Sequence, residues 1–369
     1  MSNINSKEKL FIGKEYPNPG EEKTANQIVE ILKLQMLRLD KNKKMQRQIH
    51  PKMNGCVKAE FIIEKNLPSE LKIGIFKDET SYPAWIRFSN GNTKPLPDYK
   101  KDVRGFAIKI MNVPGEKIEL EGGKGINQDF ILMNTKSFVA KNVEDFYHVL
   151  QVVTMLPFQG PVLKKVPYIL KNLSVFTNGA KSKIHCNHPF ELDYFSTVPY
   201  RFGDETKAVK YGVFPSNNND LTCQQNNRDP DFLRIKMQET LSKNEIFFDF
   251  CVQFQTDPEK MPIENPTINW SSAFQKLATI RIPAQVFDTP EQSEFGDNLS
   301  FNVWHALPEH RPIGNFNRAR KIIYEKMYTF RHDQNKIAKI EPEAGKDFFN
   351  NTNLNQHAQQ QSANHSANV

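Results

Sequence analysis

The stretch 245–255, EIFFDFCVQFQ, alternates large apolar residues with mostly smaller or polar ones, which is the period of a β-strand. One face of the predicted strand carries five apolar side chains: Ile246, Phe248, Phe250, Val252 and Phe254. A strand of this kind needs a second layer, or closure of its own sheet, to cover the apolar face. This stretch therefore predicts a sheet with one buried side.

Similar short apolar runs, bounded by Gly and Pro, occur on both sides of this strand. They predict further strands at 57–64, 83–90, 104–111, 129–134, 207–215, 276–283 and 297–303. Helical spacing covers 21–39, 143–155 and 317–332, and the sequence shows neither strand–helix alternation nor a GxGxxG motif. The pattern predicts an α+β fold with a largely antiparallel sheet, either open or closed into a barrel.

Composition predicts the domain organisation. We expect an N-terminal arm and helix in 1–45, one folded domain in 46–340, and a disordered Asn/Gln-rich tail in 341–369. The net charge of +7 is mild, and the basic residues are not interleaved with aromatic ones, which argues against nucleic-acid binding. The sequence has no apolar run of about 18 residues, so we expect no membrane span. Four scattered cysteines favour free thiols in a cytoplasmic protein.

The predicted C-terminal helix carries the first candidate site. Arg320, Tyr324 and Arg331 are offset by four and seven residues, so they share one helical stripe. A guanidinium beside a phenol favours the phenolate, and a phenolate oxygen is a ligand for ferric iron. An ordinary amphipathic helix with a half-buried tyrosine explains the same spacing.

The second candidate site lies around RQIHPKMNG (47–55) and IRFSNG (86–91). His50 has a side chain suited to general acid–base chemistry near neutral pH. Arg87 and Ser89 fall on the face of their strand opposite Phe88, where a serine could hold an imidazole through Nδ1. Gly105 in DVRGFAIKI indicates either a close backbone approach or a bulge. Each residue alone is also explained by an ordinary structural role.

The order of these motifs resembles the haem catalase superfamily. An H-x-x-x-x-G segment, RFS, D-x-RGFAIK, a D-x-x-x-x-N-T strand and R-x-x-x-Y on a late helix follow one another from about residue 47 to 331. The segments 200–215 and 310–325 are most similar to the small catalase-related proteins. The resemblance implies an antiparallel catalase-like β-barrel with surrounding helices, and haem b as cofactor.

The resemblance also implies roles for individual residues. Tyr324 is the expected axial ligand of the haem iron, Arg320 its ionising partner, His50 the distal acid–base group and Ser89 its orienting partner. The remaining expected cofactor contacts are Arg47, Arg87 and Arg331 at the haem propionates, and Phe146 at the haem face. For Phe146, a plain helix-core role is the alternative.

One position departs from the catalase pattern. Catalases place an asparagine beside the distal histidine, and an ungapped match puts Met133 there, with Asn134 one residue further on. A local bulge would bring Asn134 into the site, whereas regular strand alternation turns it away. Asn134 is therefore expected as a catalytic residue only with such a bulge, and Met133 weakens the case for efficient H₂O₂ dismutation.

The expected function is haem-dependent reduction of H₂O₂ or an organic hydroperoxide, with His50 as acid–base group and tyrosinate Tyr324 on the iron. Two alternatives remain: a non-catalytic haem-binding protein, and rearrangement of a fatty-acid hydroperoxide as in allene oxide synthases. The expected partner is a peroxide or lipid hydroperoxide substrate, and we expect a monomer or homodimer.

Overall fold

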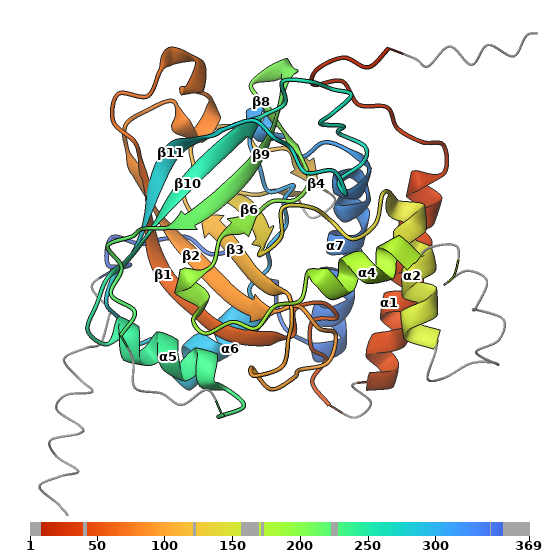
Figure 1. Cartoon of the computed structure of the whole chain (residues 1–369). Coiled ribbons are helices and arrows are strands. Elements are labelled where there is room, and N and C mark those ends of the chain that lie inside the picture. Colours follow the sequence, from red (N-terminus) through yellow and green to blue (C-terminus); the bar gives the residue numbers. More distant parts are fainter. Residues whose placement is uncertain are drawn as a thin grey trace, which may run out of the picture.

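The described strands form a closed antiparallel barrel in the computed structural model, which describes residues 9–39, 43–120, 123–155, 170, 173–222, 228–339 and 341–349 (Figure 1). The strand order is β10-β11-β1-β2-β3-β6-β7-β9, and β9 pairs with β10 to close the barrel. The barrel strands are β1 (Lys52–Ile63), β2 (Ser81–Asn90), β3 (Arg104–Ile110), β6 (Gln128–Met133), β7 (Tyr194–Phe195), β9 (Asp204–Pro215), β10 (Ile246–Phe254) and β11 (Phe274–Ile282). Strand β8 (Tyr200–Phe202) extends the sheet beyond β9, while β4 (Glu119–Leu120) and β5 (Gly123–Lys124) pair separately.

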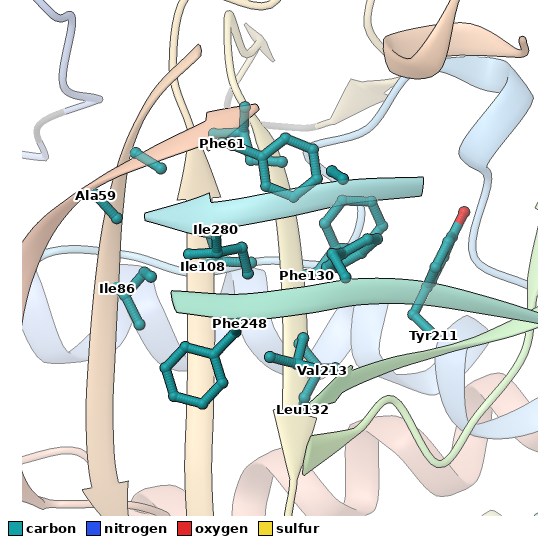
Figure 2. Packing of buried hydrophobic residues seen from close by; sticks show 14 of the residues in the cluster. Ala59, Phe61, Ile86, Ile108, Phe130, Leu132, Tyr211, Val213, Phe248 and Ile280 are labelled. Atoms are coloured by element: carbon teal, nitrogen blue, oxygen red, sulfur yellow. The ribbon is translucent and has the colours of Figure 1, made fainter. Parts of the chain in front are cut away.

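The barrel interior is filled by large apolar side chains. Phe61, Phe130 and Phe248 are fully buried there and come from three different strands (Figure 2). Aromatic rings meet edge to face, as Phe61 and Phe250 do with centroids 5.1 Å apart. Because the inward positions are occupied by this core, side chains at the alternate positions point out of the barrel, where a site can be built.

Helices cover one side of the barrel. Figure 1 shows α1 (Glu21–Leu39), α2 (Val143–Met155), α4 (Leu173–Lys181) and α7 (Asn315–Asn335) grouped beside β3 and β6. Ala25, Ile28 and Leu32 of α1 pack with Phe316 and Ala319 of α7 in a second apolar cluster. Helices α5 (Phe232–Leu241) and α6 (Pro290–Asn298) lie against β1. None of the described helices is long and apolar enough to cross a membrane.

The described residues 341–349 form a strap on the outside of the barrel. The Glu341 carboxylate accepts a hydrogen bond from the fully buried Lys109 Nζ at 2.9 Å and another from Asn127 Nδ2 at 2.6 Å. Phe348 packs edge to face on Trp85, with ring centroids 5.3 Å apart. Residues 341–349, the start of the predicted tail, thus contact the barrel, and the rest of the predicted tail lies outside the described residues.

The predicted α+β fold with a closed antiparallel sheet is confirmed. The strand expected at 297–303 is wrong: helix α6 runs to Asn298, and the residues after it are irregular. The physical reason is that the backbone carbonyls of Asp297, Asn298 and Leu299 accept hydrogen bonds from distant arginines, not from a neighbouring strand. Cys223 and most of 157–172 lie outside the described residues.

Candidate functional site

The outward faces of β2, β3 and β6 form one wall of the site. Strand register sets Ser89 opposite Gly105 and Gly105 opposite Met133, so these three residues share one rung of the ladder. The next rung joins Arg87, Ala107 and Ile131 in the same way. Strand alternation therefore carries a serine and an arginine to the outer surface while their neighbours fill the barrel.

His50 lies over this wall, just before β1. Its φ of 59° is in the left-handed region, which turns the chain sharply ahead of the strand. His50 Nδ1 lies 3.0 Å from Ser89 Oγ. A β-carbon on Gly105 would come within 2.6 Å of both His50 Cε1 and Nδ1, so glycine makes room for the ring. Of the two alternatives for Gly105, a close approach or a bulge, the structure shows the close approach.

The imidazole of His50 is held neutral. Burial, followed by the positive charges of Arg87 and Arg47, lowers the pKa of His50 from 6.5 to about 3. A neutral imidazole with one nitrogen bonded to a serine can accept a proton at the other nitrogen at any pH near neutrality.

Helices α1 and α7 form the opposite wall and enclose a cavity of roughly 990 Å³, its open mouth included. Leu32 and Met36 come from α1, while Tyr324 and Tyr328 come from α7. The charged and polar lining consists mostly of residues expected from the sequence: Arg47, His50, Arg87, Ser89, Tyr324 and Arg331. The structure thus brings six of the expected site residues into one cavity.

Three arginines gather around Asp297 at one end of this cavity. Arg331 Nη1 donates to the Asp297 carbonyl at 2.7 Å, and Arg47 Nη2 donates to the same oxygen at 3.2 Å. Arg87 Nη2 lies 3.9 Å from the Asp297 carboxylate. Burial lowers the pKa of all three arginines, to about 10 for Arg87, yet each stays charged at neutral pH. One carboxylate faces three guanidinium groups, so the cluster has an excess of positive charge.

This excess fits a group with two carboxylates, such as haem. Arg47 Nε and Arg87 Nε are buried and have no hydrogen-bond partner among the described residues. A buried N–H without an acceptor is costly, and an anion bound in the cavity would supply one. The apolar walls of the cavity and a phenol on α7 are also what a haem requires.

Arg320 lies beside Tyr324 but does not line the cavity. Its guanidinium carbon is 5.9 Å from the centroid of the Tyr324 ring, and Nη1 donates to Asn317 Oδ1 at 3.3 Å. Arg320 is therefore placed to act on the phenol from outside the cavity.

The buried hydroxyl of Tyr200 has no partner among the described residues, and burial raises its pKa.

The structure does not bring Asn134 or Phe146 into the cavity. The Asn134 side chain accepts a hydrogen bond from the Arg104 backbone N–H at 2.6 Å and donates to the Ser182 carbonyl at 3.3 Å. The bulge that would have turned it inward is not present: β6 keeps its register through Met133. Phe146 packs on Phe316 with centroids 5.9 Å apart, the plain helix-core role.

Sequence reasoning missed Tyr328 and Asp297. Tyr328 is four residues after Tyr324, so the helical stripe that selected Tyr324 carried the signal for it. Asp297 acts through its backbone carbonyl as well as its carboxylate, and a carbonyl leaves no trace in residue type.

Comparison with known proteins shows which proteins this chain resembles. No family model matches the sequence. A catalase-related peroxidase from Mycolicibacterium paratuberculosis is 22% identical over 285 residues, which cover 72% of this chain and 83% of that protein. The structure resembles catalase A from Saccharomyces cerevisiae with a TM-score of 0.56 and 14% identity, covering 85% of this chain and 70% of the yeast chain. The chain is similar in sequence to a catalase-related peroxidase and has the fold of the catalases.

Two further structures resemble this catalase-like chain. A fungal catalase has a TM-score of 0.55 and 14% identity, covering 83% of this chain; the chain spans 62% of the length of that catalase. A bacterial catalase has a TM-score of 0.53 and 16% identity, covering 92% of this chain and 67% of its own. At these identities the structures establish the catalase fold, and the chemistry of the cavity is argued from its own residues.

Proposed function

We propose that the chain reduces hydroperoxides with a haem b bound between α7 and the outer face of β2 and β3. The observation that carries the proposal is a neutral, serine-bonded His50 in the same cavity as Tyr324 and three arginines with excess positive charge. A haem bound there supplies redox-active iron.

Four residues would hold the haem. The Tyr324 oxygen would hold the haem iron, and the guanidinium carbon of Arg320 lies 5.9 Å from the centroid of the Tyr324 ring. Arg47, Arg87 and Arg331 are the proposed partners of the two propionates, because planar guanidinium groups pair well with carboxylates. The unpartnered Nε atoms of Arg47 and Arg87 support this assignment.

His50 is the proposed acid–base residue. It takes the proton from the hydroperoxide O–H and returns it to the oxygen that leaves as water or alcohol. Ser89 fixes the ring through Nδ1, and Gly105 lets the ring lie flat against the strand. The low pKa of His50 keeps the base available at neutral pH, and transfer of the proton back is rapid because the imidazolium is unfavourable in this buried place.

Peroxidase-type reduction is favoured over dismutation of H₂O₂. Met133 shares its rung with Gly105, so a thioether stands on the site face where catalases are expected to have an amide. A Met side chain cannot donate a hydrogen bond to peroxide. The name of the mycobacterial relative, a catalase-related peroxidase, supports the same choice. The free, buried thiols of Cys56, Cys186 and Cys251 suit the cytoplasmic location we expect.

The test begins with haem binding. The purified protein is loaded with haemin, and the absorption spectrum is compared with that of Tyr324→Phe and, as a control, Tyr99→Phe, whose ring is exposed on the surface. We expect an altered or lost Soret band only in Tyr324→Phe. An unchanged spectrum in Tyr324→Phe would rule out the tyrosinate assignment.

The second step measures turnover of H₂O₂, cumene hydroperoxide and a fatty-acid hydroperoxide by wild type and His50→Ala. We expect reduction to the alcohol, lost in His50→Ala while haem content is retained. Haem binding with equal turnover in both proteins would indicate a non-catalytic haem protein. Conversion of the fatty-acid hydroperoxide without formation of its alcohol would indicate rearrangement instead.

A further inference from the structure

A second pocket of roughly 1,060 Å³, open mouth included, lies next to the haem cavity. It is formed by the segment before β1, the loop after β2, the start of α5 and the end of α6. Its lining combines four prolines with charged groups. The residues used below are Pro51, Lys52, Met53, Arg234 and Asp297.

The pocket is held rigid by one lysine. Lys52 Nζ donates to the carbonyls of Leu96 at 3.1 Å and Pro230 at 2.7 Å. It also lies 2.8 Å from a carboxylate oxygen of Asp98 and 2.8 Å from one of Asp231. These contacts tie three separate segments together, and the proline rings restrict the backbone of the rim further. The pocket therefore exists before any ligand arrives.

Only one layer of side chains separates this pocket from the proposed propionate site. Arg87 lines the haem cavity, and its Nη2 donates to the carbonyl of Pro51 at 3.5 Å. The same nitrogen lies 3.9 Å from the carboxylate of Asp297. Pro51 and Asp297 both line the second pocket, so a molecule bound there sits directly behind the arginine cluster.

Arg234 gives this pocket its recognition group. Its Nη2 donates to the Met53 carbonyl at 3.0 Å, the one hydrogen bond of this guanidinium within the described part of the chain. A guanidinium has five N–H donors arranged as a fork, so a paired edge is left for two adjacent oxygen atoms of a ligand. The prolines offer apolar faces to a flat ring.

We propose that this pocket binds the electron donor, a small aromatic reductant with two adjacent oxygen atoms of the catechol type. The proposal rests on the proposed hydroperoxide reduction. A separate electron donor is needed because Met133 disfavours dismutation. An enzyme that oxidises a second peroxide poorly needs another source of electrons. A donor in this second pocket, behind the arginine cluster, would approach the edge of the haem without entering the cavity that takes the hydroperoxide.

The reaction balances as a two-electron transfer. The catechol loses two electrons and two protons and becomes an ortho-quinone. The hydroperoxide receives them: its O–O bond breaks, and one alcohol and one water are formed. The hydroperoxide is the only oxidant required.

Binding is tested first, on haem-free protein, by titrating catechol with saturation-transfer NMR or calorimetry. Wild type is expected to bind, Arg234→Gln to bind at least about tenfold more weakly, because a charge-assisted pair is lost, and Arg234→Lys to lie between them. The matched control is Arg281→Gln, an arginine of β11 that is paired with Glu245 and does not line the pocket. Thermal unfolding of each variant checks that the pocket has folded. No binding by wild type, or equal binding by folded Arg234→Gln, would overturn the proposal.

Steady-state kinetics of haem-loaded protein form the second arm. Arg234→Gln is expected to raise the KM for catechol by a similar factor and to leave the rate of the first reaction with hydroperoxide unchanged. A catechol KM that does not respond to Arg234 would overturn the donor site while leaving hydroperoxide reduction intact. Catechol binding that depends on Arg234 in a protein that fails to load haem would refute the proposed function instead.

Discussion

The ring of His50 lies against the bare α-carbon of Gly105, so closely that a β-carbon at 105 would stand 2.6 Å from His50 Cε1. The same β-carbon would stand 2.8 Å from Ser89 Oγ. One missing side chain therefore sets both the position of the imidazole and the length of its hydrogen bond to Ser89.

Gly105→Ala is expected to displace His50 and to reduce hydroperoxide turnover by about 100-fold or more, the usual contribution of a positioned acid–base group. Haem content should not change, because Gly105 is on the side of the cavity opposite Tyr324. Stopped-flow turnover and the absorption spectrum measure the two quantities. Gly179→Ala, at a half-buried glycine of α4 where an added β-carbon would meet no atom within 4 Å, is the control. Full turnover by Gly105→Ala would contradict the role given to this contact.

Arg87→Met is expected to stabilise the haem-free protein and to weaken haem binding. Arg87 is 3% exposed and carries a charge that one distant carboxylate balances poorly. Removing such a charge should raise the free energy of unfolding by about 1–3 kcal/mol. Urea denaturation of the haem-free protein and haem titration check the two effects. Arg281→Met, which removes a guanidinium paired with two glutamates, should bring no such gain. A less stable haem-free Arg87→Met would argue against excess charge in the cluster.

Acid should destabilise the protein through buried neutral histidines. Burial lowers the pKa of His188 from 6.5 to about 4, and its ring accepts a hydrogen bond from the Phe190 backbone N–H at 3.1 Å. Above pH 6.5 the ring is neutral in both states. Between pH 6.5 and about 4 the unfolded chain binds a proton that the folded chain does not. Stability is therefore lost as the pH falls through this range, by about 1.4 kcal/mol per pH unit for each such histidine.

His188→Asn is expected to abolish the difference in proton binding between the folded and unfolded chain at this position. It should keep the N-cap of the short helix Pro189–Glu191, since asparagine is a good N-cap residue. The slope of the unfolding free energy between pH 5 and 6 should fall by about 1.4 kcal/mol per pH unit. Denaturant unfolding at several pH values measures it. His148→Asn, on the half-buried surface of α2, is the comparison variant. An unchanged slope in His188→Asn would show that His188 is already protonated in the folded protein.

Glu341→Gln and Asp129→Asn are expected to lower the free energy of unfolding by different amounts. Lys109 is fully buried between the two carboxylates, each 2.9 Å from its Nζ. Burial opposes the charge of Lys109, but the two carboxylates outweigh it and raise its pKa. Asp129→Asn removes the fully buried partner and should cost about 3–5 kcal/mol. Glu341→Gln leaves that partner in place and should cost about 1 kcal/mol, with increased quenching of Trp85 fluorescence as the strap loosens. Equal losses of stability would show that Glu341 of the strap stabilises the fold as much as Asp129 of the barrel does.

The strands could be predicted because each has one face in the barrel core. In β10 the alternation of Phe248 and Phe250 with smaller or polar residues reports that burial directly. Helix α5 was not predicted: Leu233, Met237 and Leu241 recur every four residues, but the buried polar residues Lys236 and Thr240 interrupt the apolar stripe. The strand expected at 297–303 failed because its backbone groups bond to Arg47 and Arg331, and no local pattern records such distant partners.

The site also contains residues that the sequence could predict and residues that it could not. His50, Ser89 and Tyr324 could be found because their residue types and order carry the chemistry. Asn134 was expected only with a bulge, and the strand register decides against one. Such a choice depends on pairing between strands, which one strand's own sequence does not contain.

The strap makes the barrel depend on a residue that is synthesised late. Lys109 and Asp129 emerge from the ribosome early, but Glu341 follows Lys109 by 232 residues. Because a nascent chain folds as it is made, most of the barrel is available before the strap reaches it. Until then the outer face of Trp85 is uncovered and the buried lysine has one carboxylate instead of two. A chain truncated shortly before residue 341 would therefore present a barrel whose flank at Trp85 is still open to chaperones.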